Sequence, residues 1–319
     1  MPIATPPASA GKELRRFACT SCGKCCDRGP EVELSEATAL ADRFRTSLLF
    51  KVHSLPNSER SESAASWWRN EGSRIPIRPA LEENRRHLSH FASRRRSDKS
   101  RDRQVFLTIS AIVDDDQQGR CPALVDDLCT IYDVRPLTCR TVPMHYSRPP
   151  SVLRGYLDRF TATPGYECDV TQTAPIVLDG NAILDPMIRQ YRDEAIGMAK
   201  AERAWKERML LLMDDAEQAR AAQLPSYDAI LTNSDNGYAT LLPMIVAWRV
   251  ARTHGLLSSD AFEDLCRKQA ALIRAAIDRA PQHASRSDLL DTLSLYEFEL
   301  SRASRSAPAP AFLASPSFR

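Results

Sequence analysis

The chain has 319 residues, of which 43% are hydrophobic and 26% are charged, and its formal net charge at pH 7 is +2. These values are typical of a globular protein, and they exclude a global electrostatic attraction to nucleic acid or to anionic membranes. No apolar run approaches the ~20 residues that a membrane-spanning helix needs, so we expect no association with a membrane.

Residues 1–16 are rich in Pro and Ala and are predicted to form a flexible N-terminus. They contain no hydrophobic segment of the kind that directs secretion, which predicts a cytoplasmic protein. In such a reducing compartment, closely spaced cysteines are more often metal ligands than disulfide partners. The chain has nine cysteines, and this odd number fits poorly with a complete set of internal disulfides.

Residues 17–180 contain eight of the nine cysteines, many prolines and few long periodic stretches. We therefore predict a loop-rich cysteine-cluster domain that binds metal and depends on it for order. Within this domain, apolar residues at spacings of three and four predict a helix over residues 33–50. Residues 105–113 are predicted to form a short strand that leads to Cys121.

Residues 85–103 form a basic insert between Cys26 and Cys121, with eight Arg or Lys residues against two Asp. One interpretation is a contact for polyanions such as nucleic acid, in which Arg94, Arg95 and Arg96 bind phosphates. The other is a solvated and poorly ordered insert. The second is favoured, because Phe91 is the one aromatic residue of the segment and no platform for base stacking is evident.

Residues 185–304 carry apolar side chains at helical spacing and are predicted to form four amphipathic helices. The first starts near Ile188 and continues past Ala216, and the others cover residues 241–252, 262–277 and 289–300. Residues 305–319 are mostly Ala, Pro and Ser and are predicted to be a disordered tail. The expected fold class is therefore mainly α, with a loop-rich, metal-organised N-terminal half, little β structure and a C-terminal helical bundle or layer.

Eight cysteines are predicted to bind metal. The first group has the spacing C-x-x-C-x-x-C-C, whose two-residue gaps allow a tight loop to turn successive sulfurs toward one centre. Zinc takes four ligands in a tetrahedron, and an iron–sulfur cube such as 4Fe-4S takes one thiolate at each of four corners, so eight thiolates suffice for two centres. The predicted ligands are Cys19, Cys22, Cys25, Cys26, Cys121, Cys129, Cys139 and Cys168. The alternative is that one or two of them, Cys168 before the others, are buried thiols.

Cys25 and Cys26 are adjacent, and neighbouring side chains of an extended chain point in opposite directions. We therefore expect these two cysteines to serve different centres. His145 is either a further ligand or a structural hydrogen-bonding residue. Cys266 shares a helix face with apolar residues and is predicted to be a core thiol.

Four basic residues lie beside the predicted ligands in the sequence. They either offset the negative charge of the thiolates or are surface cations. They are Lys24, Arg28, Arg135 and Arg140.

The ordered motifs resemble one known family. They read Phe17-x-Cys19-x-x-Cys22-Gly23-x-Cys25-Cys26, then Cys121-Pro122-x-Leu124, then Cys129-x-Ile131-Tyr132-x-x-Arg135-Pro136-x-x-Cys139-Arg140-x-x-Pro143. Together they resemble the YkgJ-type CxxCxxCC proteins, which are described as zinc- or iron-chelating. The resemblance covers residues 17 to about 170, with a longer interval than usual between the two groups of cysteines, and it implies a bound zinc ion or iron–sulfur cluster.

Three functions remain open. The first is a metal-binding protein that holds zinc or an iron–sulfur cluster through cysteine thiolates. The second is an S-adenosylmethionine-dependent protein lysine methylase, because the cysteine-cluster family is similar to the cluster region of flagellin lysine methylases. The third is a polyanion-binding adaptor with a structural zinc site. The sequence contains no glycine-rich phosphate loop, G-x-S-x-G elbow or H-E-x-x-H helix that would indicate a particular enzyme class.

Overall fold

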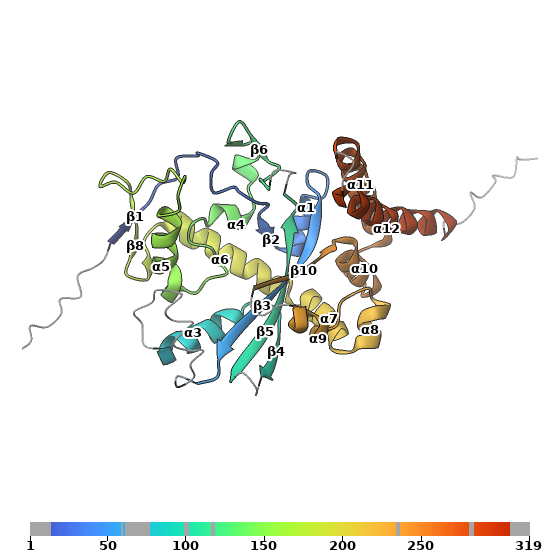
Figure 1. Cartoon of the computed structure of the whole chain (residues 1–319), viewed down its shortest axis with the longest axis horizontal. Helices are drawn as coiled ribbons and strands as arrows, with labels where there is room; N and C mark the ends of the chain where they lie inside the picture. Colours follow the sequence, from blue (N-terminus) through green and yellow to red (C-terminus); the bar gives the residue numbers. More distant parts are fainter. Residues whose placement is uncertain are drawn as a thin grey trace, which may run out of the picture.

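The computed structural model describes residues 14–58, 60, 77–98, 102–115, 119–233, 237–280 and 284–306. They form a mixed α/β protein with three sheets (Figure 1). The prediction of a mainly α fold with little β structure is therefore wrong. Except for residues 14–16 and 305–306, which belong to a strand and a helix, the predicted flexible N-terminus and disordered tail lie outside the described residues.

The largest sheet has the strand order β10 (Gly237–Pro243), β3 (Thr46–Pro56), β5 (Arg103–Val113) and β2 (Glu31–Val32). Strand β4 (Ser93–Asp98) also pairs with β5. Strands β3 and β5 are antiparallel and paired along their whole length, from Thr46 opposite Val113 to Pro56 opposite Arg103. Seven consecutive residues of β5 are buried, so this strand lies in the interior with both faces covered.

The helix predicted over residues 33–50 is mostly absent. Helix α1 (Leu34–Ala39) occupies the first third of this segment, and β3 begins at Thr46. Leu48, Phe50 and Val52 alternate along β3 and are buried in the main core, which is the period of a strand. Pairing with β5 along eleven residues thus determines the conformation of this segment.

The two smaller sheets lie in the cysteine-bearing half. One has the order β1 (Leu14–Arg16), β8 (Ile176–Asp179) and β9 (Ala182–Ile183), and the other is the hairpin of β6 (Leu124–Val125) and β7 (Leu128–Cys129). The helices of this half are α3 (Ile77–Leu88), the 3-10 turn η2 (Tyr132–Val134), α4 (Leu137–Arg140) and α5 (Pro150–Thr161).

The remaining helices follow in sequence. They are α6 (Pro186–Ala201), α7 (Arg203–Asp214), α8 (Ala216–Ala221), α9 (Tyr227–Asn233), α10 (Ile245–Thr253), α11 (Ser259–Arg279) and α12 (Ala284–Ser306). The segment predicted as the first helix therefore forms three helices, which are separated at Glu202 and at Asp215. The Asp215 carboxylate accepts hydrogen bonds from the amides of Glu217 and Gln218 in α8. Residues 241–243, predicted to be helical, end strand β10.

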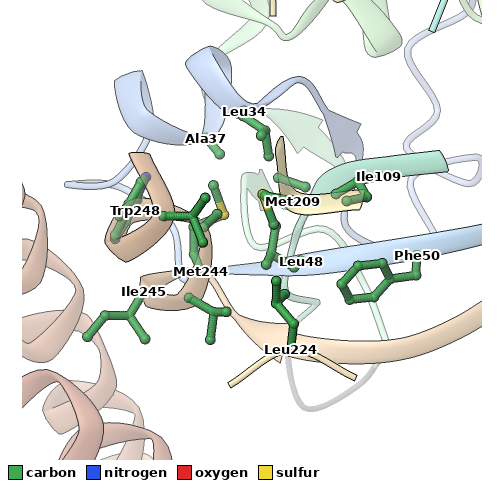
Figure 2. Packing of buried hydrophobic residues seen from close by; sticks show 14 of the residues in the cluster. Leu34, Ala37, Leu48, Phe50, Ile109, Met209, Leu224, Met244, Ile245 and Trp248 are labelled. Carbon is green, nitrogen blue, oxygen red and sulfur yellow. The ribbon is translucent and has the colours of Figure 1, made fainter. Parts of the chain in front are cut away.

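The main hydrophobic core combines both halves of the chain. Leu48 and Ile109 of the central strands pack in one cluster with Met209 of α7 and Trp248 of α10 (Figure 2). Figure 1 shows α7, α9 and α10 beside the central strands, with α11 and α12 packed against each other at one end of the molecule. The helices after residue 185 thus cover a sheet to which the cysteine-bearing half contributes every strand except β10.

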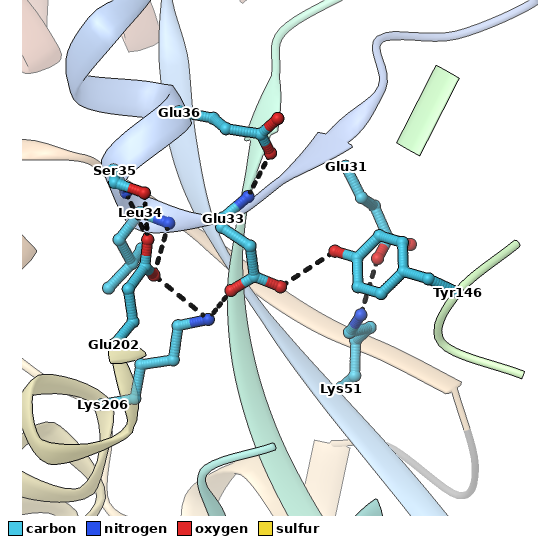
Figure 3. A network of polar contacts seen from close by, with 9 residues as sticks. All are labelled: Glu31, Glu33, Leu34, Ser35, Glu36, Lys51, Tyr146, Glu202 and Lys206. Carbon is cyan, nitrogen blue, oxygen red and sulfur yellow. Dashed lines mark hydrogen bonds and ion pairs between the residues drawn. The ribbon is translucent and has the colours of Figure 1, made fainter. Parts of the chain in front are cut away.

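A buried polar network also joins the halves (Figure 3). The Lys206 ammonium lies between the carboxylates of Glu33, with which it forms a close ion pair, and Glu202, at 3.3 Å. The Tyr146 hydroxyl donates to Glu33 at 2.9 Å. The Glu36 side chain accepts from the Leu137 amide at 2.9 Å, which links α1 to the start of α4.

The basic segment is part of the fold. Its described residues form the end of α3, a turn, β4 and the start of β5, so the prediction of a poorly ordered insert is wrong for them. Arg94 and Arg96 form ion pairs with Asp214 and Asp228 respectively, and the Arg96 guanidinium lies over the Tyr227 ring. These contacts pair two of the three arginines that the polyanion interpretation requires, and Arg95 is exposed. Residues 99–101 lie outside the described part.

Within the described ranges, none of the helices combines the length and the apolar composition required to cross a bilayer.

Candidate metal centre

One cavity of about 1290 Å³ is lined by every cysteine that the sequence predicted as a ligand. The ninth cysteine, Cys266, is fully buried in the main core, which confirms the prediction of a core thiol. The structure therefore brings together thiols that are separated by up to about 150 residues in the sequence. The cysteines of the cavity are Cys19, Cys22, Cys25, Cys26, Cys121, Cys129, Cys139 and Cys168.

Cys168 lies beside the first cysteines of the chain. An isolated antiparallel bridge joins Ala18 to Asp169, with N–O distances of 2.8 and 3.1 Å. This bridge aligns Cys19 with the segment that carries Cys168. Burial raises the pKa of the Cys168 thiol, and the neighbouring thiols of Cys22 and Cys19 raise it further.

Cys25 lies between Cys26 and the pair Cys19 and Cys22. Its thiol donates a hydrogen bond to Cys26, which raises the pKa of Cys25, and burial and the charges of Cys26, Cys19 and Cys22 act in the same direction. The same hydrogen bond lowers the pKa of Cys26. Cys25 therefore interacts both with the first two cysteines and with Cys26.

Cys26 belongs to a second set of neighbours. Its carbonyl oxygen accepts the amide of Cys121 at 3.1 Å. The hairpin of β6 and β7 pairs Leu124 with Cys129. Burial raises the pKa of the Cys139 thiol, and the charges of Cys121, Cys26 and Cys129 raise it further.

We assign the eight cysteines to two sets of four by the charges that act on each thiol. The first set contains Cys19, Cys22, Cys25 and Cys168. The second set contains Cys26, Cys121, Cys129 and Cys139. Each set draws on both sequence regions, and the sets touch where Cys25 donates to Cys26.

Gly23 and Asp127 hold the two cysteine-bearing loops together. Gly23 has a positive φ of 69°, and a Cβ atom there would lie 2.4 Å from the Asp127 carbonyl oxygen, so glycine is needed for both conformation and approach. The Asp127 carboxylate forms ion pairs with Lys24 at 3.2 Å and with Arg120 at 2.5 Å. Lys24, considered as a thiolate partner in the sequence, pairs with this carboxylate.

Sequence reasoning missed Asp127, although the sequence carries a signal for it. Asp126 and Asp127 both have positive φ, and they form the turn between the short apolar strands β6 and β7. Two Asp residues between apolar residues are typical of a tight hairpin turn. A two-residue turn at these positions predicts that Cys129 lies opposite Leu124, as it does.

Arginines line the second set. Arg135 donates to the Tyr132 carbonyl at 2.8 Å and stacks on the Tyr132 ring at 3.6 Å. Its charge favours the thiolate form of both Cys26 and Cys139. Arg140 donates to the Arg135 carbonyl at 2.7 Å, and Arg28 also lines the cavity. For Arg135, this arrangement fits the offset of thiolate charge expected from the sequence.

The donor chemistry fits a soft or borderline metal, because thiols dominate the cavity. The sulfurs are not arranged as a closed coordination shell. Among the residues that the structure describes, no three His, Cys, Asp or Glu side chains are close enough to one another to hold an ion as they stand. Coordination would require the cysteine side chains of each set to rotate toward a common point.

Two loop-rich segments of the chain thus converge on one cavity that is lined by eight cysteines. Residues 18–169 match the model of the CxxCxxCC family, whose description is "Putative zinc- or iron-chelating domain". The match confirms the resemblance of the motifs. No curated protein and no solved structure matches the chain. The helices from α6 onward lie outside the matched residues.

Proposed function

We propose that the protein holds metal in two four-thiolate centres, one for each set of cysteines. The observation that supports the proposal is the pattern of charges in the cavity: Cys19 and Cys22 act on Cys25 and Cys168, whereas Cys26, Cys121 and Cys129 act on Cys139. Four thiolates complete the tetrahedral shell of zinc, and they equally supply the four corners of a 4Fe-4S cluster. Zinc in these positions would fix the converging loops, and an iron–sulfur cluster would in addition transfer electrons.

Single serine substitutions test the division. Cys25→Ser should remove the metal of the first centre and Cys26→Ser that of the second, because serine keeps the size but is a poor ligand for these metals. The double variant should lose both. Cys266→Ala is the matched control, since this thiol lies in the core and outside both sets, and it should retain full metal content.

The measurement is metal content per chain, with the visible spectrum of protein purified without oxygen. Broad absorption that bleaches on reduction identifies iron–sulfur, and a colourless protein with bound zinc identifies the structural alternative. If either single variant loses all metal, the two centres are one or are obligately coupled. Unchanged metal in both single variants contradicts the assignment of Cys25 and Cys26 as ligands.

A further inference from the structure

The cavity extends beyond the cysteines to an aromatic wall. Phe160 of α5 contacts three other rings: Tyr156 at 6.3 Å, Tyr166 at 5.1 Å and Phe17 at 6.4 Å between centroids. All four rings line the cavity. Its volume of about 1290 Å³ exceeds the roughly 300–1,000 Å³ of typical small-molecule pockets. The cavity is therefore large enough to admit a small molecule.

A cationic group without a counter-charge lies at the end of this wall. The Arg148 guanidinium lines the cavity and stacks on the Tyr156 ring at 4.0 Å. Within the described ranges, this side chain forms no ion pair and no hydrogen bond. The nearby acidic residue Glu31 is engaged by Lys51 at 2.6 Å. Arg148 is thus available to an anion that enters the cavity.

The backbone around Arg148 is fixed by hydrogen bonds from a buried arginine. Arg192 of α6, which is 5% exposed, donates to the carbonyl oxygens of Met144 and His145, both at 2.6 Å, and of Arg148 at 2.8 Å. One buried guanidinium therefore anchors the segment that carries His145 and Arg148. Such prior ordering reduces the entropy cost of binding a ligand.

His145 supplies the second polar group. Its Nδ1 atom accepts from the Ser147 amide at 3.1 Å, and the Ser147 hydroxyl lies 2.6 Å from the same atom. Because an amide can only donate, Nδ1 carries no proton, and the neutral ring holds its proton on Nε2. His145 lines the cavity, and the charge of Arg148 contributes to its electrostatic environment. The ring thus offers an N–H donor near a free guanidinium.

We infer that the cavity binds a small organic anion, with its oxyanion group on Arg148 and the Nε2–H of His145 and its apolar body against the Tyr156 and Phe160 rings. A guanidinium pairs with carboxylate and phosphate alike through parallel N–H donors. The aromatic wall selects for a ligand with an unsaturated or apolar body. The site shares its cavity with the cysteines, but its anion-binding groups, Arg148 and His145, are not among the predicted metal ligands.

Binding to metal-loaded protein tests the inference. The probes are phenyl phosphate, benzoate, inorganic phosphate and neutral benzyl alcohol, followed by saturation-transfer NMR and by titration. Phenyl phosphate or benzoate should bind more tightly than either inorganic phosphate or benzyl alcohol. The comparison of phenyl phosphate with benzoate shows whether a phosphate or a carboxylate head is preferred.

Two variants locate the site. Arg148→Gln should weaken binding of the preferred probe by about tenfold or more, as expected for loss of a charged hydrogen bond. His145→Phe keeps the ring but removes the N–H donor and should weaken binding severalfold. Arg95→Gln, at an exposed position of β4, is the matched control and should bind normally.

The metal content of each variant separates this inference from the two-centre proposal, since all three variants should retain their metal. The inference is overturned if neither organic anion binds at about millimolar concentration, a weak affinity for any specific site. It is equally overturned if folded Arg148→Gln and His145→Phe both bind as the unmodified protein does, or if inorganic phosphate binds as tightly as phenyl phosphate.

Discussion

Among individual residues, buried histidines give the protein a pH dependence that is independent of its thiols. His87 of α3 is 6% exposed, and in the described structure its Nε2 atom has no hydrogen-bond partner. Burial, assisted by the charge of Arg192 and by His90, lowers the pKa of His87 to about 4. Burial likewise lowers the pKa of His53 to about 4.

The sign of the effect follows from proton linkage. The unfolded chain binds a proton at His87 near pH 6.5, whereas the folded chain binds it near pH 4. The stabilisation is therefore complete above pH 6.5 and is lost as the pH falls toward 4. Between pH 7.5 and pH 5, His87 should account for a loss of about 2 kcal/mol in the free energy of unfolding.

His87→Phe removes this titration and preserves a ring that can contact Phe91. Relative to the unmodified protein, the variant should gain about 2 kcal/mol on moving from pH 7.5 to pH 5. Denaturant unfolding of both proteins at the two pH values measures this difference. Acid-induced metal loss affects both alike and cancels. A stability difference that does not change with pH contradicts the role of His87.

Gly23 provides a second test on a single residue. Gly23→Ala combines a positive φ with a Cβ atom only 2.4 Å from the Asp127 carbonyl oxygen, so the two cysteine loops must move apart. Gly180→Ala is the matched control, because Gly180 also has a positive φ, of 59°, but no atom within 4 Å of the added Cβ. The control should cost about 1 kcal/mol.

Gly23→Ala should destabilise the protein more than the control and should also reduce metal retention, because its loops carry ligands of both proposed centres. Competition with a chelator measures retention in the two variants. Equal retention would mean that the approach of Gly23 to Asp127 is not needed for metal binding.

Secondary-structure elements with local periodicity were predictable, and those formed by distant pairing were not. The spacing of Phe262, Leu265 and Ile273 locates α11, and all three are buried. The same reasoning predicted a helix that continues to residue 50, although β3 begins at Thr46. The prediction arose because Leu34, Ala37, Leu40 and Phe44 follow helical spacing, and these residues are indeed buried. The pairing of β3 with a strand some 57 residues later cannot be read from a local window.

The candidate site was predictable in composition but not in arrangement. The spacing of the first group and the eight predicted ligands were visible in the sequence, and all eight line the cavity. The grouping of Cys168 with Cys19 rests on the bridge between Ala18 and Asp169, a contact across about 150 residues that no local pattern encodes. Arg148 and its aromatic wall depend likewise on how α5 packs beside the cysteine loops.

Helix α7 is held against α1 by a buried charge, which predicts a large effect of a single substitution. Lys206 is 2% exposed and lies between Glu33 and Glu202 (Figure 3). Lys206→Met leaves two buried carboxylates without a cation and should cost about 3–5 kcal/mol. Glu202 also accepts from the amides of Leu34 and Ser35, so the start of α1 should loosen too.

The matched control is Lys268→Met in α11. Lys268 pairs with Asp264 at 2.7 Å, but both side chains are at least 40% exposed. Such a surface pair contributes little to stability, because solvent screens it. Denaturant unfolding at pH 7 measures both variants. Equal stability of the two variants would contradict a structural role for the buried network, and the double variant Lys206→Met with Glu33→Gln should recover part of the loss.

The whole molecule consists of a shared core and a peripheral cysteine region that differ in what stabilises them. The central sheet is covered by helices from the second half, and Leu48, Phe50, Met209 and Trp248 pack in one cluster (Figure 2). The loops of the second cysteine set instead expose apolar side chains: Val125, Leu128, Tyr132 and Val134 are 48–60% exposed. Hydrophobic burial therefore stabilises the core more than these loops.

This difference predicts a local response to metal removal. Chelation, verified by metal analysis, should increase amide exchange in residues 17–28 and 119–140, where ligands of both proposed centres lie. Strands β3 and β5 should keep their protection, because their hydrogen bonds are paired along eleven residues and enclosed by the shared core. Mass-spectrometric hydrogen exchange of loaded, chelated and reloaded protein gives the comparison, and reloading should restore the loops. Exchange that rises equally in β5 would show that metal supports the entire fold, and unchanged loops would show that the cysteine segments are ordered without it.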